Sequence, residues 1–144
     1  MRAILSTTVP LFVLFLFAFP VTSHAGTLRI MPLGDSITAG EHYGFPAFGV
    51  RTGYRKPLYE LMAANGYDVD FVGSLCWGFD ITPPFDFDHE GHPGWTASQI
   101  ANNVYPWLEQ NPPDIILAHV GTNGLNVHND GKQDLCDRIR KRCP

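Results

Sequence analysis

The stretch TLRIMPLGDSITAG, residues 27–40, joins an apolar run to a turn that carries polar side chains. The run 27–33 is typical of a buried β-strand, and Gly34 ends it. Asp35 and Ser36 follow at once. A serine in this place is either the N-cap of a helix or a nucleophile displayed at the end of a strand.

The rest of the chain repeats this strand and helix pattern. Residues 57–66 predict a helix that begins near Pro57 and stops at Asn65-Gly66, and residues 67–73 alternate like a second strand. Thr96 and Gln99 form the pattern of a capping box at the start of another helix, which Pro106 should kink or split.

The run 112–121 has the continuous apolar character of a strand in the middle of a parallel sheet, while residues 75–92 predict a long irregular loop. The order strand, helix, strand, helix, strand predicts an α/β fold of three layers, α/β/α, with a parallel sheet.

Three polar blocks fall next to strand ends or helix starts. Ser36 follows the first strand, Asn123 follows the third, and Gly94 precedes the capped helix. Ligands gather beyond the carboxyl ends of parallel strands, so we expect these blocks to face one crevice. Taken singly, the three residues are equally well explained as a helix cap, a turn glycine and an Asx-turn.

The blocks GDSIT (34–38), PGWT (93–96) and GTN (121–123), in this order, resemble those of the SGNH (GDSL) hydrolases. The wider phrases RIMPLGDSITAG, HEGHPGWTASQI and PDIILAHVGTN are similar to carbohydrate esterase family three, which includes acetylxylan esterases. The resemblance implies a flavodoxin-like sheet. It also implies Ser36 as the nucleophile, with an oxyanion hole made by the backbone N–H groups of Ser36 and Gly94 and the side-chain amide of Asn123.

The family pattern also has a histidine base in an Asp-x-x-His block beyond GTN, and this chain lacks that block. The 21 residues after Asn123 contain one histidine, His128, and the third residue before it is Leu125. The family's Asp after GTN is replaced by Gly124. We therefore expect the fold to be incomplete at its C-terminus, with an exposed sheet edge, and the chain to be a truncated or weakly active form.

Other histidines give weaker signals. Asp86 and His89 match Asp-x-x-His by letters, but they precede Gly94, so we interpret His89 as a decoy. His92 and Trp95 flank the Pro93-Gly94 step and are candidate substrate-binding residues. His119 lies inside the third strand, which predicts a core histidine with a hydrogen-bond partner.

The ends of the chain differ from its middle. Arg2, the apolar run 11–19 and the small residues Ser23 and Ala25 predict a secretory signal peptide over residues 1–25, so we expect an extracellular protein with no membrane attachment after cleavage. Residues 26–131 form the predicted SGNH hydrolase-like domain. Residues 132–144 carry five basic and two acidic residues and are either a solvated helix or sequence foreign to the fold.

Composition excludes some classes of binding partner. A net charge of −4 disfavours nucleic acid and anionic membranes. The three cysteines, Cys76, Cys136 and Cys143, lack zinc-site spacing and leave their pairing open, so no metal or cofactor is expected.

The sequence thus predicts a secreted serine esterase that removes acyl groups, acetyl above all, from a polysaccharide such as xylan. Two other readings stay open, a non-catalytic carbohydrate-binding relative and a gene-model fragment.

Overall fold

A single strand organises the sheet in the computed structural model, which describes residues 26–41, 47–124 and 131–142. Strand β1 (Leu28–Gly34) pairs in parallel with β2 (Val69–Phe71) along its first half and with β4 (Asp88–Gly91) at its last two residues. Strand β5 (Ile115–His119) runs parallel to β1 on its other edge. The short β3 (Leu75–Cys76) is antiparallel to β4. The order β2-β1-β5 matches the start of a flavodoxin-like sheet.

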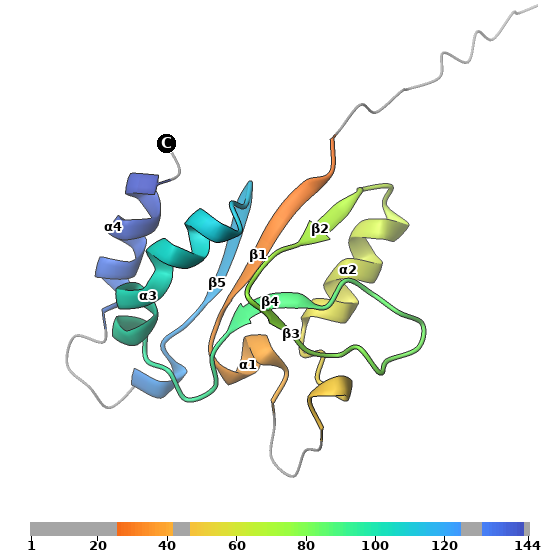
Figure 1. The fold of residues 1–144 in the computed structure, drawn as a ribbon, viewed down its shortest axis with the longest axis horizontal. Coiled ribbons are helices and arrows are strands. Elements are labelled where there is room, and N and C mark those ends of the chain that lie inside the picture. The colour runs from red at the N-terminus through yellow and green to blue at the C-terminus, as the bar shows by residue number, and fades with distance from the viewer. Residues whose placement is uncertain (1–25, 42–46, 125–130, 143–144) are drawn as a thin grey trace, which may run out of the picture.

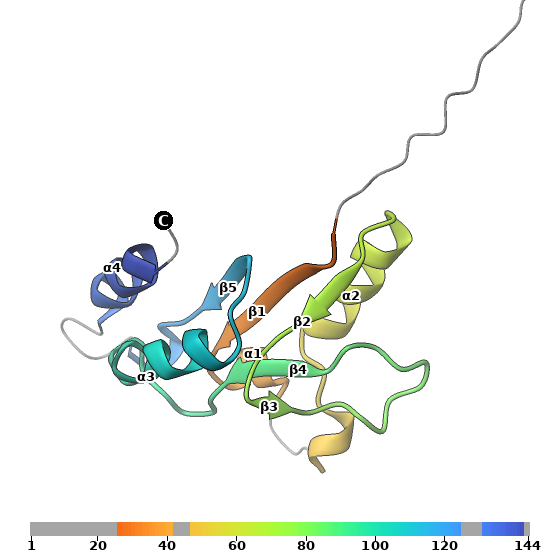
Figure 2. The same cartoon turned by 45° about the horizontal axis from the view of Figure 1, so that its top comes forward.

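Helices cover both faces of this sheet. Helices α3 (Ala97–Gln110) and α4 (Lys132–Arg142) lie together on one side, and α2 (Arg55–Ala64) lies on the other (Figures 1 and 2). The four-residue α1 (Ser36–Ala39) follows β1 directly. Two short 3₁₀ helices, η1 (Phe48–Val50) and η2 (Thr122–Gly124), complete the described elements. The predicted three-layer α/β fold with a mainly parallel sheet is confirmed.

The α3 face holds the main hydrophobic core. Its buried members come from β1, the end of β2, α3 and α4: Met31, Leu33, Val72, Ile100, Ala101, Val104, Leu108 and Leu135. The predicted capping box is present, since the Thr96 hydroxyl accepts from the Gln99 N–H at 3.3 Å and Gln99 Oε1 accepts from the Thr96 N–H at 2.8 Å. Helix α3 continues through Pro106, so the predicted split is wrong.

Residues 132–142, the described part of the basic tail, form α4. Leu135 is 1% exposed, and Ile139 packs against the same core. The Arg138 guanidinium lies 5.7 Å from the centre of the Tyr105 ring on α3. This segment is therefore a helix packed on the domain by an apolar stripe, with its charged side chains outward.

Two other expectations need correction. The predicted loop 75–92 contains β3 and β4, because Leu75 pairs with His89 and Cys76 with Asp88. The run around β5 was expected in the middle of the sheet, yet within the described part of the chain β5 pairs with β1 alone, and Ile115 is 41% exposed. An apolar strand with one free edge fits the expected exposed sheet edge.

Arg55, at the start of α2, joins segments that are far apart in the sequence. Its side chain is fully buried and donates to five backbone carbonyls. The acceptors are the carbonyl oxygens of Thr38 (3.0 Å), Ala39 (3.3 Å), Arg51 (2.8 Å), Trp77 (3.0 Å) and Phe87 (2.6 Å). Burial lowers the pKa of this guanidinium to about 10, while the neighbouring Tyr54, Asp86 and Asp88 partly offset that effect.

We predict that Arg55→Lys lowers the free energy of unfolding by about 2–4 kcal/mol, because an ammonium group cannot reach all five carbonyls and each abandoned buried acceptor costs about 1–3 kcal/mol. Chemical denaturation measures the change. Arg138→Lys is the matched control, since Arg138 forms an exposed ion pair with Asp134 at 3.0 Å, which is worth under about 1 kcal/mol. Equal losses in the two variants would contradict the role given to Arg55.

Candidate active site

Ser36 occupies the first position of α1, directly beyond the end of β1. Asp35 caps this short helix, and its Oδ1 accepts from the Ile37 N–H at 3.0 Å. Gly40 ends the helix in the left-handed region, with φ of 79°. Asp35 is fully buried, whereas Ser36 is half-buried. Asp35 therefore holds the turn while Ser36 stays partly exposed, and the cap role that competed for Ser36 belongs to its neighbour.

The second predicted block lies beside the first because β4 pairs with the end of β1, and one further backbone hydrogen bond extends that pairing. The His92 N–H donates to the Gly34 carbonyl at 2.8 Å, so the chain leaving β4 stays next to the chain leaving β1. The Trp95 N–H donates to the His92 carbonyl at 3.2 Å and closes a turn over Pro93 and Gly94. Gly94 has φ of 80°, a conformation that favours glycine, and it is exposed.

The third block joins the second through a side chain. Asn123, in η2 after β5, donates from Nδ2 to the Trp95 carbonyl at 3.0 Å. An amide nitrogen carries two hydrogens, so a second N–H of Asn123 is left for another acceptor. The structure thus brings Ser36, Gly94 and Asn123 to the same end of the sheet, as the sequence predicted.

The two candidate substrate-binding residues lie in the same turn. The His92 ring stacks against two indoles, 4.3 Å from Trp107 and 4.5 Å from Trp95, centre to centre, and the two indoles are 5.9 Å apart. Its Nε2 lies 2.7 Å from Oε1 of Glu90. The ring and its Nε2 are thus occupied by protein contacts, and Trp95 remains half-buried in the same stack.

The interpretation of His89 as a decoy agrees with the structure. His89 is fully buried, and its Nδ1 accepts from the Gly91 N–H at 3.0 Å. Asp86 accepts instead from the N–H groups of Phe71 (2.6 Å) and Asp88 (3.3 Å). Burial, with Arg55 and His92 nearby, lowers the pKa of His89 to about 2, so the ring is neutral and belongs to the core.

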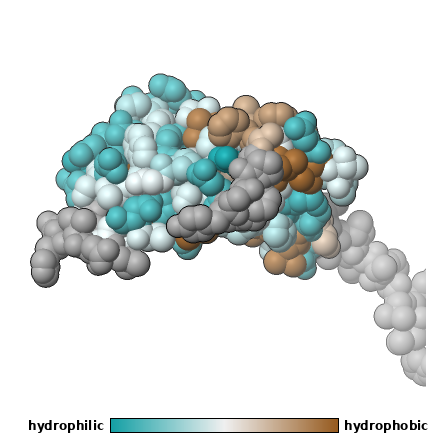
Figure 3. Space-filling view, turned by 90° about the horizontal axis from the view of Figure 1, so that it is seen from below, coloured by the Kyte–Doolittle hydropathy of each residue, from teal (hydrophilic) through white to brown (hydrophobic). Residues whose placement is uncertain are grey.

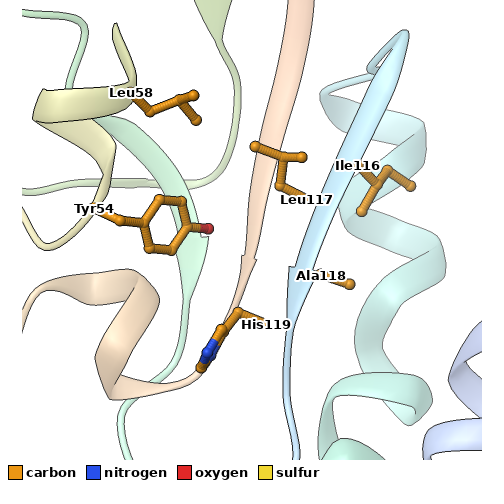
Figure 4. A pocket seen from close by; sticks show the side chains of 6 residues that line it. All are labelled: Tyr54, Leu58, Ile116, Leu117, Ala118 and His119. Atoms are coloured by element: carbon orange, nitrogen blue, oxygen red, sulfur yellow. The ribbon is translucent and has the colours of Figure 1, made fainter. Parts of the chain in front are cut away.

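His119 differs from its prediction. It is exposed at the end of β5 and lines an open hollow of about 500 Å³ with Tyr54, Leu58, Ile116, Leu117 and Ala118 (Figure 4). Figure 4 shows Tyr54 and Leu58 coming from the α2 side and His119 from β5. The prediction of a core histidine assumed a strand covered on both faces, and this face of β5 is open within the described residues.

The surface at the Ser36 end of the sheet is uneven in polarity. The view from below shows hydrophilic surface on the α3 and α4 side and hydrophobic surface on the opposite half (Figure 3). The exposed apolar side chains among the described residues include Ile37, Phe48, Val50 and Phe79. The Phe48 and Trp77 rings lie 4.6 Å apart, centre to centre, and the Arg51 guanidinium lies 4.7 Å from the centre of the Phe48 ring.

The sequence analysis missed Glu90 and Arg55. Both are charged residues buried completely in the domain. Their partners lie 16 or more residues away along the chain, apart from Arg51 and His92. Local pattern gives no signal for such contacts. Glu90 lies in the stretch HEGHPGW, but nothing in that stretch indicates that its side chain is buried.

Other kinds of site are absent from the parts of the chain that are described. Residues 26–41, 47–124 and 131–142 hold no cluster of acidic, histidine or cysteine side chains that would bind a metal. Over the same ranges no helix is long and apolar enough to cross a bilayer. Cys76 and Cys136 are exposed free thiols. The predicted signal peptide, Cys143 and His128 lie outside the described residues.

Comparisons with known proteins point to esterases. No protein-family model matches the chain. A multidomain esterase from Ruminococcus flavefaciens is 33% identical over 149 residues, covering 86% of this chain and 18% of that protein. These figures describe a segment within a much longer relative.

Solved structures give the same answer. A family 3 carbohydrate esterase from Clostridium thermocellum matches with a TM-score of 0.70 and 40% identity, over 81% of this chain and 57% of that one. A carbohydrate esterase family 3 protein from Talaromyces cellulolyticus (TM-score 0.58, 31% identity) and a mutant acetyl esterase solved with an acetate ion (0.58, 30%) each match over 81% of this chain and 56% of theirs. The chain spans a little over half the length of these three.

The buried His89 predicts a pH-dependent stability. Below pH of about 6.5 the unfolded chain protonates this histidine and the folded chain does not, because its folded pKa is about 2. The free energy of unfolding should therefore fall with decreasing pH, at up to about 1.4 kcal/mol per pH unit from this group.

Denaturation between pH 7 and 5 measures the slope. His89→Asn removes the titration and keeps an acceptor for the Gly91 N–H, so its slope should be flatter. His119→Asn makes the same substitution at an exposed histidine and is the matched control. Identical slopes in all three proteins would contradict the assignment.

Proposed function

Since the chain is a relative of the carbohydrate esterase family 3 proteins, we propose that it is a serine esterase acting on acylated carbohydrate, with Ser36 as its nucleophile. The observation that carries this proposal is the joining of three strand ends by two hydrogen bonds, His92 N–H to Gly34 O and Asn123 Nδ2 to Trp95 O. They hold the hydroxyl, the exposed Gly94 turn and the amide at one end of the sheet.

In this proposal the Ser36 hydroxyl attacks the ester carbonyl, and its oxygen bonds to the carbonyl carbon. The carbonyl oxygen gains negative charge, which the N–H groups of Ser36 and Gly94 and the second N–H of Asn123 would stabilise. Solvent water takes the Ser36 proton and returns one to the sugar alkoxide that the tetrahedral intermediate expels, so that the alcohol leaves. A second water then hydrolyses the acyl-serine, which releases the carboxylic acid and regenerates Ser36. Gly94 lacks a side chain, so an ester can approach its N–H closely.

The proton of the Ser36 hydroxyl needs an acceptor. Among the described residues no side chain hydrogen-bonds to this hydroxyl, and the buried His89 is unavailable. The described residues thus supply the oxyanion donors of the proposed reaction, and in serine proteases the oxyanion hole and substrate binding alone retain roughly 10³–10⁴ over water.

The substrate is proposed to be an acetylated polysaccharide such as xylan. The titles of the similar structures name carbohydrate esterases and an acetyl esterase, the latter with acetate. Exposed aromatic rings suit the flat apolar faces of sugars, and Phe48 and Phe79 are 52% and 53% exposed. The same rings favour the second candidate, a carbohydrate-binding protein without ester hydrolysis.

We predict that Ser36→Ala abolishes protein-dependent hydrolysis of an aryl acetate and that Asn123→Ala lowers kcat by about 10²-fold or more with little change in KM. Initial rates across substrate concentrations provide both constants. Asn103→Ala is the matched control, because the exposed Asn103 amide donates to the Gln99 carbonyl within α3. This variant should retain the wild-type rate.

An unchanged rate in Ser36→Ala would overturn the assignment of the nucleophile. Binding of acetylated xylan with no release of acetate by the wild-type chain would favour the carbohydrate-binding candidate instead.

We also propose export and removal of residues 1–25. The expected mature N-terminus is Gly26, which N-terminal sequencing of protein recovered from the medium would identify. Recovery of a chain that still begins at Met1 would contradict this proposal.

A further inference from the structure

Glu90 and His92 form a pair that the proposed chemistry does not use. Glu90 is fully buried on β4, and its carboxyl accepts from the Ser74 N–H at 2.8 Å and the Ser74 hydroxyl at 2.7 Å. His92 Nε2 is its third partner, at 2.7 Å. A buried carboxyl with three hydrogen-bond partners is fixed in place.

The His92 ring also packs against two indoles. Trp107, on α3, lies nearly parallel to it at an interplanar angle of 12°, and Trp95 lies at 28°. The two indoles are themselves 5.9 Å apart, centre to centre, so the three rings form one cluster. The side chain is 15% exposed. Its orientation is therefore set by the contact of Nε2 with Glu90 and by packing against the two indoles.

The backbone of the same residue joins all three parts of the proposed site. Its N–H holds the Gly34 carbonyl, two residues before Ser36. Its carbonyl accepts from the Trp95 N–H and closes the turn that presents Gly94. Through the Trp95 carbonyl, the turn also receives Asn123. A rotation of His92 would move the Gly94 and Asn123 donors relative to Ser36.

We propose that His92, clamped by Glu90, Trp95 and Trp107, is a positioning residue that sets the oxyanion hole of the esterase site. This inference rests on the proposed function. A histidine with a carboxyl partner also has the composition of a general base, but among the described residues no hydrogen bond joins the His92 ring to the Ser36 hydroxyl, and Nε2 is held by Glu90. Misplacement of catalytic groups by about 1 Å can cost about 10²-fold in rate, so a rigid clamp has a direct kinetic effect.

The test compares three variants of the full chain. His92→Phe keeps a ring against the indoles and removes the contact with Glu90. Trp107→Leu keeps an apolar side chain and removes one of the two indoles that pack against His92. Val104→Ala is the control for general destabilisation, since Val104 is a fully buried α3 residue of the same core and has no part in the hydrogen bonds or ring stacking that hold His92.

We expect His92→Phe and Trp107→Leu to lower kcat for an aryl acetate by about 10-fold or more with KM within about two-fold, as for groups that act in the transition state. Val104→Ala should lower the melting temperature and leave kcat within about two-fold of wild type. Amide hydrogen exchange at His92 and Trp95 should accelerate about 10-fold or more in the first two variants only, because these N–H groups close the turn.

The outcomes separate the two proposals. If Ser36→Ala is inactive while His92→Phe and Trp107→Leu match Val104→Ala in kcat and exchange, the positioning role is wrong and the proposed function stands. If Ser36→Ala keeps the wild-type rate, the proposed function fails, and the exchange rates still decide whether His92 fixes the turn. Unchanged exchange at both amides would overturn the clamp whatever the activity.

Discussion

A side chain cannot be accommodated at Gly34, and the arrangement of the site depends on that. A Cβ atom at this position would clash with the His119 carbonyl oxygen and with the Thr38 hydroxyl. Gly34 also pairs with Gly91 of β4 and accepts from the His92 N–H. Gly91 is similarly restricted, because a Cβ there would lie 2.6 Å from the Ala39 nitrogen. Two glycines thus let β1, β4, β5 and α1 converge.

Arg55 stabilises this convergence from the α2 side. Two of its five acceptors, the carbonyls of Thr38 and Ala39, are at the end of the helix that begins with Ser36. The others belong to the segments around Arg51, Trp77 and Phe87. The buried cation supplies donors to carbonyls that would otherwise be buried without partners. The position of the proposed nucleophile and the stability of the surrounding loops are therefore linked through one side chain.

Features with local causes were predictable from the sequence. The β1 strand, the capping box at Thr96 and the grouping of Ser36, Gly94 and Asn123 follow from short patterns and from the rule that parallel strand ends share an edge. The β3–β4 pair, buried Arg55 and buried Glu90 depend on partners distant in the sequence, so no periodicity indicates them. The prediction of a buried His119 was wrong because the burial of this side chain depends on what covers β5, and the strand pattern alone does not contain that information.

The account rests on Ser36 being a nucleophile rather than a capping residue. Reaction with an alkyl phosphonofluoridate tests this most directly. A nucleophilic serine oxygen displaces the fluoride and stays bound to the phosphonyl group, and peptide mass spectrometry then identifies the modified residue. The account predicts one phosphonyl adduct, on the peptide that contains Ser36, which forms more slowly after Asn123→Ala removes an oxyanion donor. An adduct on another serine, or none on the wild-type chain, would contradict it.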